Sequence, residues 1–166
     1  MIDLAGGEGR NAIWFSEQGW QSENIDWSRK ALSKSLKLAE ERGVADLHFA
    51  HVADATGFES VLTPVDIGVV AYLQVPQADL ADAIDTLTDN IRVGGHLLGV
   101  WHARENLGGG YGGPQNPDVL PTVEGLKEIC ADLPLEIEVV TNREGQVQTK
   151  DGLKPSITVI LLAKRL

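Results

Sequence analysis

Short apolar runs alternate with segments of helical periodicity along most of the chain. The run Ile67 to Ala71 is apolar on both faces, which is typical of a central strand covered by helices on each side. Ser28 and Thr122 stand where helix N-caps are expected, and Gly19 and Gly43 stand where helices should end. The pattern predicts strands over 1–5, 21–26, 48–52, 66–73, 96–101, 135–141 and 157–163, and helices over 10–18, 28–42, 78–92 and 122–130.

Strand and helix alternate five times, and two β-like runs joined by the polar segment 145–152 then follow. Short βα alternation gives an open parallel sheet with helices on both faces, and the final hairpin adds one antiparallel edge strand. We therefore predict an α/β, Rossmann-like fold in one domain over residues 1–166. Residues 106–118 hold five glycines and two prolines, so we expect an irregular, functional loop there.

The composition narrows the classes of partner. The chain has 166 residues, a formal net charge of -10 and a pI near 4.7, which argues against nucleic acid and favours a small-molecule substrate. Cys130 is the single cysteine, no leader is visible, and the longest apolar runs are shorter than the roughly 18 residues that span a bilayer. We expect a cytoplasmic protein without a membrane partner.

Three polar signals fall at the ends of successive predicted strands. The glycine-rich turn from Asp3 to Gly9 follows the first strand, Asp26 ends the second, and Asp54 with Ala55 behind it closes the third. An aspartate after a strand also fits a turn or a helix cap. One signal in each of three βα units nevertheless places all three on one rim of the sheet, where ligands of such folds bind, and predicts a nucleoside site.

Two nucleoside cofactors fit this rim. Gly7 to Ala12 satisfies the dinucleotide pattern G-x-G-x-x-G/A, with Asp26 near the expected distance. A pyrophosphate on a helix N-terminus disfavours a nearby carboxylate, however, whereas Asp3 before the turn and Glu8 inside it suit a cationic ligand. The charges favour S-adenosylmethionine over NAD, and an NAD-dependent oxidoreductase remains the alternative.

Several motifs together resemble the class I, seven-strand S-adenosylmethionine-dependent methyltransferases, nearest to the tellurite and thiopurine methyltransferase-like branch. The motifs are the glycine turn, Ile25 to Ser28, Ala53 to Asp54, Tyr72 to Pro76, Val93 to Gly95 and, less specifically, Gly112 to Pro114 and the Arg143 region. The resemblance covers nearly the whole chain and implies methyl transfer to a small-molecule nucleophile with release of S-adenosylhomocysteine. The cofactor-binding residues that it implies are Asp3, Ala5, Gly6, Gly7, Gly9, Asn11, Asp26, Trp27, Ser28, Asp54, Ala55, Ala71 and Leu73.

Direct displacement needs alignment of donor and acceptor more than a metal, and the four histidines show no metal-ligand pairing. Tyr72 follows the central strand and can orient a nucleophile. His102 ends the fifth strand and can accept a proton, and Arg143, at the end of the sixth predicted strand, can hold an anion. Each also has a plain structural or surface interpretation. These three residues are the candidates for catalysis.

Two departures from the family pattern bear on activity. Ala5 stands where the family has its first glycine, a change that a β-carbon tolerates if φ stays negative. The chain also starts within the first strand, where relatives have a preceding helix. Three expectations follow: a start upstream of Met1, a homodimer whose second copy covers the open N-terminal side, or weak donor binding. A non-catalytic S-adenosylmethionine-binding domain is therefore a second alternative.

Overall fold

The computed structural model describes all 166 residues, and its strands form a single seven-stranded sheet. The strands are β1 (Ile2–Leu4), β2 (Ser22–Asp26), β3 (His48–Val52), β4 (Val65–Ala71), β5 (Ile91–His102), β6 (Leu135–Thr149) and β7 (Gly152–Arg165). The helices are α1 (Arg10–Glu17), α2 (Arg29–Glu41), α3 (Gln77–Asn90) and α4 (Val123–Ala131), with short 3₁₀ turns at Arg104–Gly108 and Pro117–Val119. No helix is both long and apolar enough to cross a membrane.

The sheet has the strand order β3-β2-β1-β4-β5-β7-β6. Strands β1 to β5 pair in parallel, and β7 runs antiparallel to both β5 and β6. The strand order reverses between β1 and β4, and ligands bind beyond the carboxyl ends of the strands at such a point. The predicted Rossmann-like fold class is confirmed, and the final hairpin forms the outer two strands, with β7 inside and β6 at the edge.

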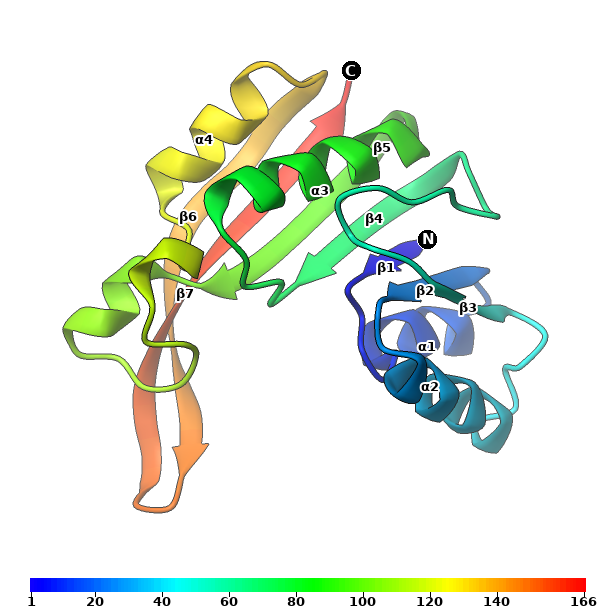
Figure 1. Ribbon diagram of the computed structural model, residues 1–166, viewed down its shortest axis with the longest axis horizontal. Helices are drawn as coiled ribbons and strands as arrows, with labels where there is room; N and C mark the ends of the chain where they lie inside the picture. Colours follow the sequence, from blue (N-terminus) through cyan, green and yellow to red (C-terminus); the bar gives the residue numbers. More distant parts are fainter.

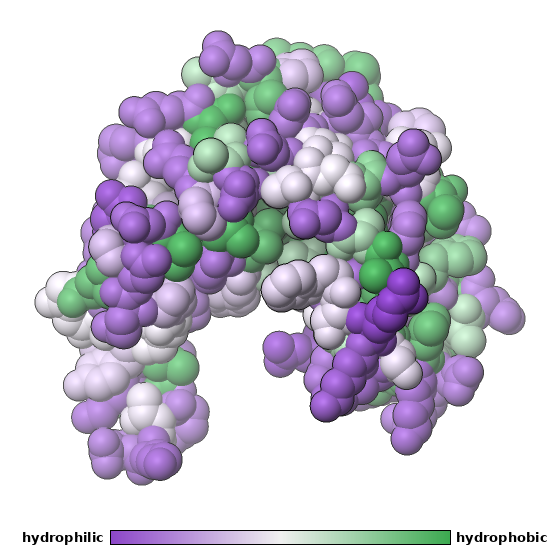
Figure 2. Space-filling model, in the orientation of Figure 1, coloured by the Kyte–Doolittle hydropathy of each residue, from purple (hydrophilic) through white to green (hydrophobic).

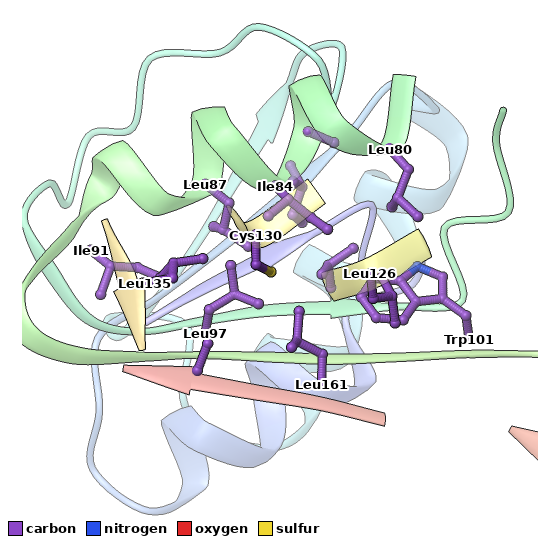
Figure 3. Packing of buried hydrophobic residues seen from close by; sticks show 14 of the residues in the cluster. Leu80, Ile84, Leu87, Ile91, Leu97, Trp101, Leu126, Cys130, Leu135 and Leu161 are labelled. Atoms are coloured by element: carbon purple, nitrogen blue, oxygen red, sulfur yellow. The ribbon is translucent and has the colours of Figure 1, made fainter. Parts of the chain in front are cut away.

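The main core lies on the face covered by α3 and α4 (Figure 1). Leu80, Ile84 and Leu87 of α3 meet Leu97, Trp101 and Leu161 of the sheet, and all six are at most 1% exposed. Figure 3 shows these side chains together with Leu126 and Cys130, which α4 contributes. Helices α1 and α2 pack on the opposite face over β1, β2 and β3. Helices therefore cover both faces of the sheet at β4, where Ala12 of α1 packs with Val69 on one face and α3 lies on the other, as the run Ile67 to Ala71 predicts.

The hairpin differs from the sequence expectation in its length. Strands β6 and β7 pair continuously to a turn at Lys150–Asp151, so the polar segment 145–152 is mostly strand, and Arg143 lies within β6 and not at its end. Backbone pairing between two strands does not require apolar side chains, and most residues of this part of β6 are exposed. Polarity alone therefore predicts a false boundary here.

The face of β5, β7 and β6 opposite α3 and α4 has no helix over it. It carries five apolar side chains at alternate positions: Leu98, Val100, Val139, Ile160 and Leu162. We call these five residues the open sheet face. Figure 2 shows the molecule hollowed into an arch between the β6–β7 hairpin on the left and the α1–α2 side on the right. The carboxyl ends of β4 and β5 point into this arch (Figure 1).

Candidate functional site

Two adjoining hollows lie at the carboxyl ends of the parallel strands. The first, of about 520 Å³, contains the side chains of Asp26, Asp54 and Asp79, and we call it the carboxylate hollow. The second lies against the glycine turn, and we call it the glycine-turn hollow. Its lining residues are Ala5, Gly6, Gly7, Glu8, Arg10, Asn11, Ala71, Tyr72 and Val100. Ala5 and Tyr72 line both hollows, so the two form one continuous surface.

The glycine turn joins β1 to α1 by a tight backbone path. The amide of Gly6 donates to the carbonyl of Ile25 at 3.3 Å, and the amide of Gly9 donates to the carbonyl of Gly6 at 2.9 Å. A β-carbon at Gly6 or at Gly9 would overlap side chains beneath the turn, and Gly9 also has φ +78°. The turn is therefore pressed onto polar side chains below it, and its upper side is free to contact a ligand.

Ala5 and Tyr72 are the only non-glycine residues with positive φ, at 54° and 61°. The negative φ under which a β-carbon at Ala5 would be tolerated is therefore not observed. The backbone at Ala5 adopts the left-handed region where the chain leaves β1 and enters Gly6. A left-handed conformation costs a residue with a β-carbon about 1 to 2 kcal/mol. Such strain gathers at functional sites, and here it occurs where the two hollows join.

Replacing Ala5 by glycine is expected to raise the free energy of unfolding by about 0.5 to 1 kcal/mol, because glycine relieves the left-handed strain but adds chain entropy. Urea denaturation monitored by circular dichroism measures the change. Ala31→Gly in α2 is the control, and it should lower the free energy of unfolding by about 0.5 to 1 kcal/mol. A loss of stability in Ala5→Gly would show that the positive φ carries no strain.

Asp3 lies beneath the turn and does not line either hollow. It is fully buried, and its carboxylate accepts hydrogen bonds from Asn11 Nδ2 at 3.4 Å and from the amide of Ala12 at 3.3 Å. Burial raises the pKa of Asp3 to about 6, and the two hydrogen bonds only partly oppose this shift. The carboxylate thus places a buried negative charge at the first turn of α1.

Asp3→Asn is expected to raise the free energy of unfolding at neutral pH by on the order of 2 kcal/mol. The folded protein binds the Asp3 proton more tightly than the unfolded chain, so unfolding free energy falls as pH rises from about 4 to about 6 and stays lower above that range. Urea denaturation at several pH values tests this. The advantage of the variant should vanish below about pH 4, and an advantage that persists there would exclude titration of Asp3 as its cause.

Asp26 ends β2 and borders the carboxylate hollow. Its Oδ2 accepts from the amide of Gly7 at 2.9 Å, and its Oδ1 accepts from the amide of Ser28 at 2.8 Å. The side chain therefore ties the glycine turn to the start of α2. Ser28 itself caps α2, since its Oγ accepts from the amide of Ala31 at 3.2 Å. Trp27 between them is 83% exposed and lines the same hollow.

Asp54 and Ala55 follow the neighbouring strand β3, and together with Leu73 they line the carboxylate hollow. Asp54 Oδ1 accepts from the amide and the hydroxyl of Thr56, at 2.9 Å and 2.8 Å, and these bonds lower the pKa of Asp54. The carboxylate is thus ionised and fixed in direction, with Oδ2 free of such partners.

Glu8 contributes less negative charge to the rim than the sequence indicates. Lys34 of α2 binds its Oε1 at 2.5 Å, and this contact lowers the pKa of Glu8. The pair offsets the charge of Glu8 at the glycine turn. Asp3 and Asp26 therefore carry the negative character of this part of the site.

The three candidate catalytic residues lie along one row across the sheet. Tyr72 and His102 have ring centroids 5.0 Å apart. His102 pairs in register with Thr158 of β7, and Thr158 pairs with Arg143 of β6. Arg143 has no carboxylate within salt-bridge distance. This row borders the open sheet face at its carboxyl end.

Two side-chain amides outside the three catalytic candidates hold this row in place. Gln74 Oε1 accepts from the amide of His102 at 2.8 Å. The buried Asn106 donates to the carbonyl of Gly112 at 2.7 Å and accepts from the amide of Ile157 at 2.8 Å, which fastens the glycine-rich loop beside His102. Burial lowers the pKa of His102, so its ring is neutral at pH 7. A neutral imidazole can accept a proton.

No family model matches the chain. It is 33% identical over 98 residues to the tRNA 5-carboxymethoxyuridine methyltransferase of Escherichia coli K12, a match that covers 58% of this chain and 38% of that protein. The match thus spans well under half the length of this curated relative.

Solved structures extend the likeness to 99% of the chain. TehB from Haemophilus influenzae has a TM-score of 0.78 at 17% identity, with 57% of that chain covered. Magnesium protoporphyrin IX methyltransferase from Synechocystis PCC 6803, solved with bound S-adenosylhomocysteine, has a TM-score of 0.74 at 17% identity, with 73% covered. The fold is therefore that of the S-adenosylmethionine-dependent methyltransferases.

Proposed function

We propose that this chain binds S-adenosylmethionine and catalyses transfer of its methyl group to a small nucleophile, with S-adenosylhomocysteine as the second product. The observation that carries the proposal is the junction of the carboxylate hollow and the glycine-turn hollow at Ala5 and Tyr72. A nucleoside in the first hollow can extend its attached chain into the second. The volume of about 520 Å³ falls within the usual range for small-ligand sites.

The residues of both hollows fit this cofactor. Each oxygen of Asp26 accepts one backbone amide and retains a lone pair for a ribose hydroxyl. Asp54 and Ala55 can bind the adenine edge, and the free side of the glycine turn can receive the methionine portion. The bound donor supplies a methyl group that its sulfonium already activates.

The buried charge of Asp3 favours this cofactor over NAD. A pyrophosphate would need the free amides at the N-terminus of α1. The carboxylate of Asp3 already accepts a hydrogen bond from the amide of Ala12 there, and its negative charge would repel a phosphate. The same charge attracts the ammonium or the sulfonium of S-adenosylmethionine.

We place the methyl acceptor against the row of Tyr72, His102 and Arg143. Neutral His102 takes the proton of a thiol or a hydroxyl, Tyr72 orients the nucleophile, and the unpaired Arg143 holds an anionic group of the acceptor. A small anionic thiol, hydroxyl compound or oxyanion fits this set. The tRNA methyltransferase relative makes a modified tRNA the second candidate acceptor.

Calorimetry with S-adenosylhomocysteine and with NAD tests the donor, and NAD binding without any response to S-adenosylhomocysteine would overturn the proposal. Transfer of an isotopic methyl group into a panel of thiols, phenols, oxyanions and tRNA then tests the reaction. Transfer to tRNA alone would replace the small-molecule acceptor by the second candidate. Donor binding without transfer to any acceptor would leave a binding domain in place of an enzyme.

A further inference from the structure

A network of hydrogen-bonded polar side chains is buried between the sheet and helices α1 and α2, outside both hollows. Each member is at most 3% exposed, although such residues are normally found at the surface. The members are Ser16 of α1, Ser22 and Asn24 of β2, Ser35 of α2 and His48 of β3. Buried polar groups of this kind remain stable only when hydrogen bonds satisfy them.

The hydrogen bonds within this network are continuous and short. Ser16 Oγ lies 2.8 Å from Ser22 Oγ, and Ser22 Oγ lies 2.9 Å from His48 Nδ1. On the other side of the ring, His48 Nε2 lies 2.7 Å from Ser35 Oγ. Asn24 Nδ2 then donates to Ser35 Oγ at 3.1 Å and to the carbonyl of Gly7 at 3.0 Å. The network therefore begins in the core and ends on the glycine turn.

One placement of the protons gives every hydroxyl hydrogen an acceptor. Ser16 donates to the carbonyl of Leu47 at 3.4 Å, so Ser22 donates to Ser16 and accepts from Nδ1–H of His48. His48 Nε2 then accepts from Ser35, and Ser35 accepts from Asn24. This arrangement needs a neutral ring, and burial lowers the pKa of His48. The direction in which Asn24 points its amide thus depends on Ser35 and His48.

Two side chains of this network, Ser35 and Asn24, also support the glycine turn from below. A β-carbon at Gly9 would overlap Ser35 Oγ and lie 3.0 Å from Asn24 Nδ2, so the backbone of Gly9 packs directly on this pair. Gly6 packs in the same way on Asn24 Oδ1. The hydrogen bond to Gly7 and these two packing contacts fix three of the turn's residues from below.

We propose that Asn24, Ser35 and His48 are positioning residues that hold the glycine turn in the shape that receives the amino-acid portion of the methyl donor. They touch no ligand and act through Gly6, Gly7 and Gly9. The inference rests on the proposed function, since it requires that a donor occupy the glycine-turn hollow. It also gives a reason for the buried polar side chains of β2, which packing of an apolar core does not require.

The experiment compares two ligands that share the adenosine part. S-adenosylhomocysteine carries the amino acid, and 5′-methylthioadenosine lacks it. Ser35→Ala is expected to weaken S-adenosylhomocysteine binding about tenfold, which is the scale of one lost buried hydrogen bond, and to change 5′-methylthioadenosine binding by less than about twofold. Calorimetry at a temperature where circular dichroism shows the variant folded gives both constants. Ser35→Cys, which fills the site with a weaker hydrogen-bond partner, replaces Ser35→Ala if that variant does not fold.

Thr88→Val is the matched control, because it removes another fully buried hydroxyl from α3 without contact to the turn. It should leave both affinities unchanged. An equal loss of affinity for both ligands in the Ser35 variant, or no loss for either, would overturn the positioning role. The proposed function would still stand in that case, provided that the wild-type protein binds S-adenosylhomocysteine. Failure of the wild-type protein to bind S-adenosylhomocysteine would overturn the proposed function and this inference together.

Discussion

Asp26→Ala is expected to weaken S-adenosylhomocysteine binding roughly hundredfold, because charge-assisted hydrogen bonds contribute about 1.5 to 3 kcal/mol each. The carboxylate would accept the ribose hydroxyls, and it also holds the amide of Gly7 at 2.9 Å. Its loss therefore removes a ligand contact and loosens the glycine turn. Isothermal titration calorimetry measures the change in Kd.

Asp79→Ala is the matched control for Asp26→Ala. Asp79 lines the same hollow, so it contributes a similar charge, but it is exposed in the first turn of α3 and has no side-chain hydrogen bond that fixes it. Its removal should change the Kd by less than about threefold, as expected for a solvent-screened charge. Equal losses in both variants would mean that overall charge, and not the geometry of Asp26, governs binding.

His102→Gln is expected to lower the rate of methyl transfer about hundredfold and to leave S-adenosylhomocysteine affinity unchanged, since general-base catalysis contributes about 10² to 10⁴ in rate. Burial lowers the pKa of His102, and only the unprotonated ring accepts a proton. The wild-type rate should therefore fall as pH is lowered through a range below the ordinary histidine pKa. A single-turnover assay with isotopic donor, run across that range, measures both effects.

His96→Gln is the control for His102→Gln. His96 lies on the same strand and the same side of the sheet, six residues from His102, and it contacts Glu138 at 3.6 Å. Its replacement should affect neither rate nor pH dependence. A pH profile that stays the same in His102→Gln would assign the proton transfer to a different group.

The fold could be predicted because its local signals agree with its topology. Alternating apolar runs and helical periodicity locate the sheet and helices, and strand ends place Asp26 and Asp54 on one rim. The weak apolar signal of β2 has a physical cause, since Ser22, Glu23 and Asn24 are fully buried in polar contacts. Amino-acid type alone does not show which polar residues are buried together.

The parts of the site that the sequence did not predict all depend on tertiary contacts. The positive φ of Ala5 follows from the path between β1 and α1. The neutralisation of Glu8 depends on Lys34, which is 26 residues away in the chain. Likewise, the burial of Asp3 beneath the turn depends on the packing of α1 over β1. These features become visible only when distant segments are brought together.

The long hairpin gives the two sides of the arch different stiffness. On the α1–α2 side, the turn rests on buried side chains, whereas the distal half of β6 has no core beneath it and is mostly exposed. Local opening costs least where few apolar contacts resist it. The ribbon should therefore fray from Lys150 and Asp151 inward, with amide exchange slowing toward Val140 and Leu161. Under the proposed function, the flexible hairpin would face a rigid donor site, and acceptors of different bulk would then be admitted without disturbing the donor.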